Sequence, residues 1–300
     1  MLAAAAAWGS TGTAAHFAAA GASPASVGAA RIAIGGALLL IIALSTADLR
    51  RATGRLLAGA SERPWLTRLV LVVASGAVAG YQVCFFTAVR LGGVAVGTVV
   101  AIGSAPVLTG LLSRLTGGPP LGRRWGAATA AAVIGCVVLV TGGRAIGIRP
   151  DAVMLAITAG LCYAVYAVAA RRLIAGGTPE TAVMGLLFGG AAVLLAPVLA
   201  VSPDGWLLTA RGLGIASYLG VVTTAAAYLL YGRGLRTVTA PVAVTIGLAE
   251  PAVAALLGLV VLGERLTGAA VAGLLLIGLA LVGVAGDKSA VGPAPPGPPG

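Results

Sequence analysis

Two stretches of the chain repeat one pattern, and this repeat decides the fold. Residues 81–118 read YQVCFFTAVRLGGVAVGTVVAIGSAPVLTGLLSRLTGG, and residues 228–263 read YLLYGRGLRTVTAPVAVTIGLAEPAVAALLGLVVLG. In each stretch a Tyr opens an apolar run that leads to an Arg, and a second apolar run contains a Pro and ends near a Gly. Pro106 and Pro251 lie 145 residues apart, and the closing Gly keeps the same offset. The spacing predicts two copies of one structural unit.

Both stretches belong to a chain that is apolar along almost its whole length. Its 300 residues are 59% hydrophobic and only 9% charged, and its mean hydropathy is +1.05. Because a soluble domain carries about 25% charged residues, this composition predicts helices that cross a membrane, each with about 20 apolar residues. Charged or Gly/Pro-rich gaps place the expected spans at residues 2–20, 27–46, 67–89, 94–113, 124–142, 151–170, 180–200, 212–232, 240–262 and 268–286.

Ten spans give five to each copy, and an odd number turns the second copy over in the membrane. The expected fold is therefore an all-α membrane protein with ten transmembrane helices, arranged as two inverted five-helix repeats. We place the repeats at residues 1–145 and 146–286, followed by a disordered Pro/Gly-rich tail at residues 287–300. Inverted repeats are common in transporters, whose binding sites lie near the bilayer midplane between the repeats.

The net charge of +11 follows the gaps between the spans. In a soluble protein it would suggest nucleic acid, but here it indicates orientation in a lipid bilayer, so we expect no nucleic-acid partner. If the N-terminus is inside, thirteen of the 19 basic residues fall on the inner side. This bias predicts that both termini of a multi-pass protein of the inner (plasma) membrane are cytoplasmic. Trp65, Trp125 and Trp206 are expected to anchor the chain at the interfaces.

Four places resemble the EamA-like branch of the drug/metabolite transporter superfamily. They are Trp8-Gly9-Ser10, Arg31-Ile32-Ala33, Glu250-Pro251 and Leu262-Gly263-Glu264-Arg265-Leu266. The last two are close to the family's Glu-Pro and Gly-Glu-x-Leu pattern, and the resemblance covers roughly residues 1–286. It implies a transporter that exports amino acids, metabolites or toxic compounds, or imports sugars.

The first repeat departs from this pattern. It has Ala105-Pro106 where the second has Glu250-Pro251, and Gly118-Pro119 where the second has Gly263-Glu264. The resemblance therefore does not imply a role that needs an acid in both halves.

Glu250 is the one acid near the centre of an expected span. A charged carboxylate at that depth costs about 2.5–3.5 kcal/mol on insertion scales, so the side chain should face a cavity or a partner, or be protonated. It is a candidate proton or substrate-ammonium site. The alternative is that it caps backbone groups freed by Pro251, since both Pro251 and Pro106 are expected to kink their helices.

Other polar side chains inside the spans are candidates for a substrate or proton pathway. These are His16, Arg31, Tyr81, Gln82, Tyr163, Tyr166 and Tyr228. Each also has a structural interpretation: His16 as a helix-packing residue, Arg31 as a cation that snorkels to the outer interface, and the tyrosines as belt residues. The belt interpretation fits Tyr81 and Tyr231 better than Tyr163 and Tyr166.

The sequence contains no motif for catalysis, phosphate binding or a metal. Cys84, Cys136 and Cys162 are isolated in apolar runs, so we expect neither a cofactor nor an enzyme. The first hypothesis is a secondary transporter for a small metabolite, amino acid or drug-like solute, exporting by alternating access. The second is a carrier or flippase for a lipid-linked substrate. The sequence leaves a monomer and a homodimer open.

Overall fold

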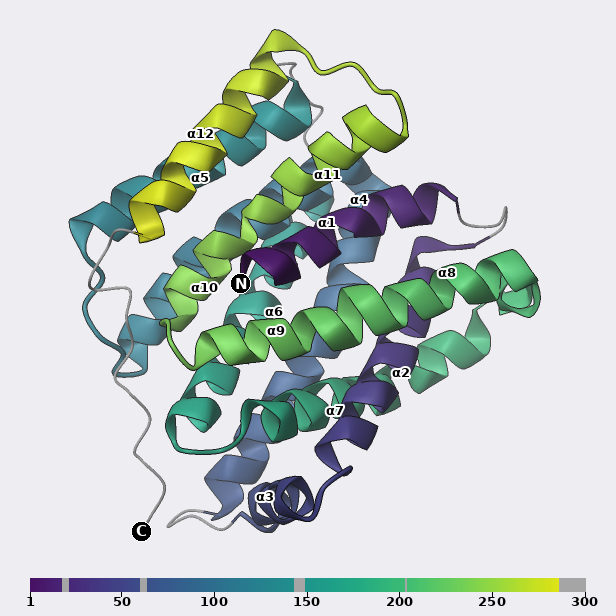
Figure 1. Cartoon of the computed structure of the whole chain (residues 1–300), viewed down its shortest axis with the longest axis vertical. Coiled ribbons are helices and arrows are strands. Elements are labelled where there is room, and N and C mark those ends of the chain that lie inside the picture. The colour runs from purple at the N-terminus through teal and green to yellow at the C-terminus, as the bar shows by residue number, and fades with distance from the viewer. Residues whose placement is uncertain (18–21, 60–63, 143–148, 203, 286–300) are drawn as a thin grey trace.

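The computed structural model describes residues 1–17, 22–59, 64–142, 149–202 and 204–285, and within them the chain is helical without β-strands (Figure 1). The helices of the first half are α1 Leu2–His16, α2 Pro24–Ala43, α3 Ala47–Ala58, α4 Pro64–Leu115 and α5 Arg123–Thr141. Those of the second half are α6 Pro150–Ala175, α7 Glu180–Val201, η1 Asp204–Leu208, α8 Ala210–Gly220, η2 Val221–Ala226, α9 Ala227–Leu235, α10 Ala240–Gly247, α11 Ala249–Val261 and α12 Gly268–Ala285. The predicted tail at residues 287–300 lies outside the described residues.

Eight helical segments in the described part are long and apolar enough to cross a membrane. The longest, α4, contains the expected third and fourth spans and is interrupted at Gly93, whose φ of 83° favours glycine. In α1, 15 residues are helical, fewer than a full span needs. The all-helical membrane fold is confirmed, while the count of ten spans stays a prediction.

One helix falls in a gap that the hydropathy pattern leaves as a loop. α3 lies between the second and third spans, and its first turn is capped by the Thr46 side chain, which accepts a hydrogen bond from the Leu49 N–H at 3.2 Å. It ends at Gly59 in the left-handed conformation. Because many of its residues are charged, α3 contains no long apolar run and the hydropathy pattern does not predict it.

Equivalent helices of the two halves pack against each other in opposite directions. In the α5–α12 pair, Ala128 near the start of α5 meets Gly283 near the end of α12, and Gly135 meets Ile277. Figure 1 shows these two helices side by side. Close approach depends on Gly135, where an added Cβ would lie 2.9 Å from the carbonyl oxygen of Gly273.

The α2–α7 pair follows the same rule. Gly36 lies against the backbone of Phe188, and Gly185, earlier on α7, lies against the backbone of Leu39, later on α2. Two pairs of equivalent helices are thus antiparallel, which is the relation that inverted repeats require.

Contacts between loops agree with an alternating path of the chain. Arg236 forms an ion pair with Glu180 at 3.6 Å, which joins the gap before α10 to the gap before α7. Arg211 donates to the carbonyl oxygen of Phe17 at 2.7 Å, which joins the gap before α8 to the end of α1. Gaps predicted on the same side therefore meet in space, although these contacts do not say which side is cytoplasmic.

Trp206 corrects one prediction. It lies in η1 with 4% of its surface exposed, and its Nε1–H donates to Ser26 Oγ at 2.7 Å. The interfacial interpretation of Trp206 is wrong, because the loop folds back over α2 and satisfies the indole N–H there. Trp65, by contrast, is 65% exposed at the start of α4, as an interfacial residue would be.

Candidate functional site

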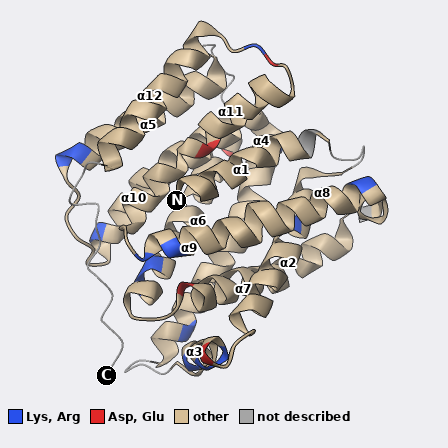
Figure 2. Cartoon of the chain, in the orientation of Figure 1, with Lys and Arg blue, Asp and Glu red and all other residues tan. Residues whose placement is uncertain are grey.

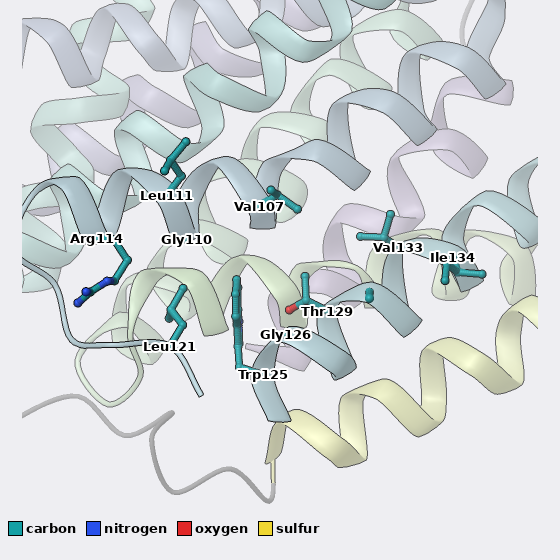
Figure 3. Close-up of a pocket in the computed structure, with 11 residues that line it drawn as sticks. Val107, Gly110, Leu111, Arg114, Leu121, Trp125, Gly126, Thr129, Val133 and Ile134 are labelled. Carbon is teal, nitrogen blue, oxygen red and sulfur yellow. The ribbon is translucent and has the colours of Figure 1, made fainter. Parts of the chain in front are cut away.

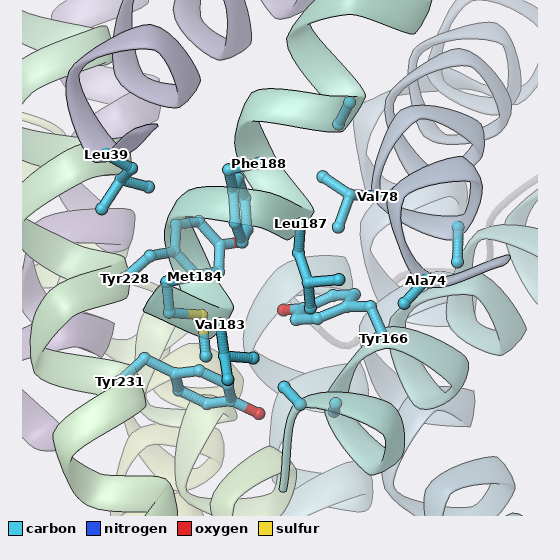
Figure 4. Packing of buried hydrophobic residues seen from close by; sticks show 14 of the residues in the cluster. Leu39, Ala74, Val78, Tyr166, Val183, Met184, Leu187, Phe188, Tyr228 and Tyr231 are labelled. Carbon is cyan, nitrogen blue, oxygen red and sulfur yellow. The ribbon is translucent and has the colours of Figure 1, made fainter. Parts of the chain in front are cut away.

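Seven aromatic rings from five helical segments form the centre of the main hydrophobic core, and we call them the central aromatic cluster. They are Trp8 of α1, Tyr81 of α4, Tyr163 and Tyr166 of α6, Phe188 of α7, and Tyr228 and Tyr231 of α9. Figure 4 shows Tyr166, Phe188, Tyr228 and Tyr231 converging on one interior region. Both halves of the chain contribute, so the cluster lies where the halves meet.

The rings contact one another in a continuous path. Tyr163 and Tyr166 stack with centroids 5.1 Å apart, and Phe188 and Tyr228 lie 3.9 Å apart. Trp8 lies 5.1 Å from Tyr228. Packed aromatic rings offer apolar surface together with π faces that attract cations.

Glu250 lies beside this cluster at a break in the ninth span. α10 ends at Gly247 and α11 begins at Ala249, with Leu248 between them. Because Pro251 has no N–H, it cannot donate to the carbonyl oxygen of Gly247 and the regular helical ladder is interrupted. Glu250 follows directly on the break and is half-buried within a packed region.

Arg31 of α2 supplies the opposite charge. It interacts electrostatically with Glu250, Tyr81 and Tyr228, yet in the described part of the chain no ion pair within 4.0 Å joins it to Glu250. Arg31 therefore lies near Glu250 and the cluster without a direct ion pair to Glu250.

Two buried donors around the cluster, Trp8 Nε1 and Arg31 Nε, have no hydrogen-bond partner among the residues that the structure describes. The buried hydroxyls of Tyr163 and Tyr231 interact with each other. A buried polar group without a hydrogen bond costs about 1–3 kcal/mol, so such groups are usually satisfied by water or a ligand. Unpartnered donors near a carboxylate suit a small polar solute.

Most predicted candidates gather here. Tyr81, Tyr163, Tyr166 and Tyr228 belong to the cluster, and Gln82 is buried next to Tyr81 on α4. His16 is the last residue of α1, but its side chain lies outside the described residues. Pro106 is buried inside α4, which continues through it.

The belt interpretation of Tyr231 is wrong, because only 1% of its surface is exposed and it packs against Trp8. Tyr81 is partly buried and contacts Tyr163, which also differs from a belt position. Sequence reasoning named Trp8 for its motif and missed its place in the site. Phe188 gave no signal, since one Phe in an apolar span is ordinary.

In the part of the chain that the structure describes, no three His, Cys, Asp or Glu side chains group as a metal site would need. Cys136 is buried, and Cys84 and Cys162 are partly buried, as free thiols.

The model of the EamA-like transporter family matches residues 1–141 and again residues 151–286. The chain belongs to this family. The match covers both halves, in agreement with the duplicated architecture. Members of the family are membrane transporters, so the chain is a multi-pass membrane transporter of small solutes and not an enzyme.

Individual relatives agree with this placement. The chain is 37% identical over 260 residues to the "Uncharacterized transporter YwfM" of Bacillus subtilis, covering 87% of this chain and 83% of that protein. It is 36% identical to the "Threonine/homoserine exporter RhtA" of Salmonella typhimurium over 118 residues, 38% of each chain. A solved crystal structure matches with a TM-score of 0.76 and 25% identity, covering 95% of this chain and 94% of that one.

Proposed function

We propose that this protein exports a small solute with an ammonium group, of the amino-acid class, across the inner membrane by alternating access between its two halves. The observation that supports the proposal is the site itself: a carboxylate, a guanidinium and a cluster of aromatic rings to which both halves of the chain contribute. We also propose that both termini are cytoplasmic, because most of the basic residues fall in the gaps on that side.

The chemistry of the two charges matches the two ends of an amino acid. Glu250 and the π faces of Tyr163 and Tyr228 suit an ammonium group, and Arg31 suits a carboxylate. A solute that pairs with both Glu250 and Arg31 would also lower the free-energy cost of holding these two charges in the membrane interior. The partial similarity to a threonine/homoserine exporter supports this substrate class.

Alternating access is supported by the symmetry of the frame. Because equivalent helices α2 and α7 pack antiparallel across the centre, exchanging the conformations of the two halves would turn an inward-facing site into an outward-facing one. The chain contains no phosphate-binding motif, so we expect gradients of protons or solutes to drive the cycle.

Purified protein in proteoliposomes tests the proposal. Vesicles loaded with a labelled amino-acid mixture should lose specific members of it faster than protein-free vesicles, and external unlabelled substrate should accelerate the loss by exchange. Decarboxylated and deaminated analogues of the exported solute should compete poorly. If no zwitterionic solute is moved while lipid or uncharged solutes are, the proposed substrate class is wrong.

One observation favours a second candidate, a carrier for a lipid-linked substrate. A cavity of about 540 Å³ lies between the second half of α4 and α5, with Arg114 and Trp125 at one end and Val133 and Ile134 at the other (Figure 3). Its walls are almost entirely apolar. A scramblase assay with fluorescent lipids in the same vesicles distinguishes it, since an amino-acid exporter leaves lipid asymmetry unchanged.

A further inference from the structure

A polar cavity lies outside the central aromatic cluster, where α3 faces the turn between α6 and α7. Its volume is about 570 Å³, and we call it the α3 pocket. Its charged lining residues are Asp48, Arg51, Arg55 and Arg172. Figure 2 shows the charged residues of α3 gathered at this end of the largely uncharged molecule.

The charges of the α3 pocket do not cancel. Arg51 pairs with Asp48 at 3.0 Å, and both side chains remain well exposed. Arg55 and Arg172 form no side-chain hydrogen bond or ion pair with the residues that the structure describes. Two guanidinium groups from two different helices are thus available to one anion.

Hydrogen bonds from side chains to backbone carbonyl oxygens fix the position of α3 and therefore of its arginines. Arg68 of α4 donates to the carbonyl oxygens of Leu57 and Ala58, both at 3.1 Å, and so ties the end of α3 to the next span. Thr53 Oγ1 donates to the carbonyl oxygen of Ala43 at 3.3 Å. Arg51 and Arg55 are four residues apart and share a face of the helix.

Apolar side chains lie next to this basic site. Leu56 and Leu173 line the same cavity as Arg55 and Arg172. A soluble ion gains nothing from these neighbours, whereas a lipid can place its phosphate on the arginines and the first part of its chains against the two leucines.

We propose that the α3 pocket binds the phosphate of an anionic phospholipid, with Arg55 and Arg172 as its direct ligands. The planar guanidinium group matches a phosphate with two parallel hydrogen bonds. Basic pockets between membrane helices on the cytoplasmic side are typical headgroup sites. This site is separate from the transport site, and its assignment does not depend on which solute is moved.

Native mass spectrometry of the full chain, with phosphatidylglycerol or phosphatidylcholine added, tests the proposal. The wild type should retain phosphatidylglycerol more strongly than phosphatidylcholine. The double variant R55Q/R172Q should bind phosphatidylglycerol about thirtyfold more weakly, as expected for two lost arginine contacts. Arg123→Gln removes an exposed arginine elsewhere at a predicted cytoplasmic span end and should bind as the wild type does.

A gain-of-binding variant guards against misfolding as an explanation. Asp48→Asn removes the one acid among the charged lining residues and frees Arg51, so it should bind phosphatidylglycerol several-fold more tightly. Equal retention of phosphatidylglycerol by R55Q/R172Q and the wild type would overturn the proposal. Displacement of the lipid by millimolar inorganic phosphate would overturn the lipid assignment in favour of a soluble anion.

Discussion

The two prolines that mark the repeat lie in helices that differ. α4 continues through Pro106, and the residue before it, Ala105, is fully buried. The equivalent span in the second half breaks at Leu248, and the residue before Pro251 is the partly exposed Glu250. The neighbouring glycines nonetheless keep their roles: Gly9 packs on the Glu250 backbone, and Gly160 packs on the backbone of α4 at Ala101.

The two halves share their helix packing and differ in their polar residues. The packing of the two regions is preserved, because helix contacts depend on small residues that both halves retain. The polar group is present in one half only. We infer that the first half has become a packing partner, while the second half presents the charge that a solute meets.

The largest expected effect comes from removing that charge. Glu250→Gln should slow solute export about tenfold to a hundredfold, the range for losing one charge-assisted hydrogen bond. Initial rates of efflux from proteoliposomes measure it. Glu264→Gln, in the exposed loop after α11, is the matched control and should keep the wild-type rate; full activity in Glu250→Gln would mean that the acid only shapes the helix.

Arg31→Gln should have the next largest effect, about a tenfold rise in KM with a smaller change in the maximal rate. The physical reason is the loss of the guanidinium that suits the solute carboxylate. Competition by an amide analogue of the solute, which lacks that carboxylate, should be unaffected. The matched control is Arg265→Gln in the loop after α11, and an equal KM in both variants would remove Arg31 from the site.

Proline replacement compares the two regions directly. Pro251→Ala restores an N–H that can donate to Gly247 and straighten the span, so export should fall several-fold and amide hydrogen exchange near residues 247–251 should slow. Pro106→Ala lies in a helix that is already continuous and should leave export within twofold of the wild type. Equal losses in the two variants would contradict the asymmetry.

The smallest effect is expected at a single hydroxyl. Tyr163→Phe removes a buried hydroxyl that interacts with the hydroxyl of Tyr231, so thermal stability should change little while export falls about twofold to tenfold. Tyr218→Phe is the control, because its hydroxyl bonds to Ser10 at 2.8 Å outside the central aromatic cluster. A loss of stability without a loss of export would assign Tyr163 a purely structural role.

Sequence alone predicted much of this architecture, because a membrane demands long apolar runs whose ends are marked by charge. The predicted spans at 180–200 and 268–286 correspond to α7 Glu180–Val201 and α12 Gly268–Ala285. The sequence did not predict the helix α3, since a charged helix at the surface has no such apolar run. It also did not predict that two spans join into α4, because Gly93 can bend a helix as readily as it ends one.

The site was predictable only in its unusual residues. Glu250 stood out because an acid is costly at mid-bilayer, and the resemblance to a known family drew attention to Trp8 and Arg31. Which tyrosines face inward depends on helix rotation, and hydropathy says little about rotation when a helix is apolar all round. For that reason Tyr231 was misassigned to the interface and Phe188 gave no signal.

Alternating access requires the two ends of the molecule to open in turn, and paired distance measurements by electron spin resonance report on both ends. In a variant without the native cysteines, one spin-label pair at residues 57 and 237 would report on one end of the molecule, and a pair at residues 90 and 211 on the other. All four positions are exposed. We predict that adding the exported solute shortens one distance while it lengthens the other; two distances that stay fixed, or that change together, would contradict the account.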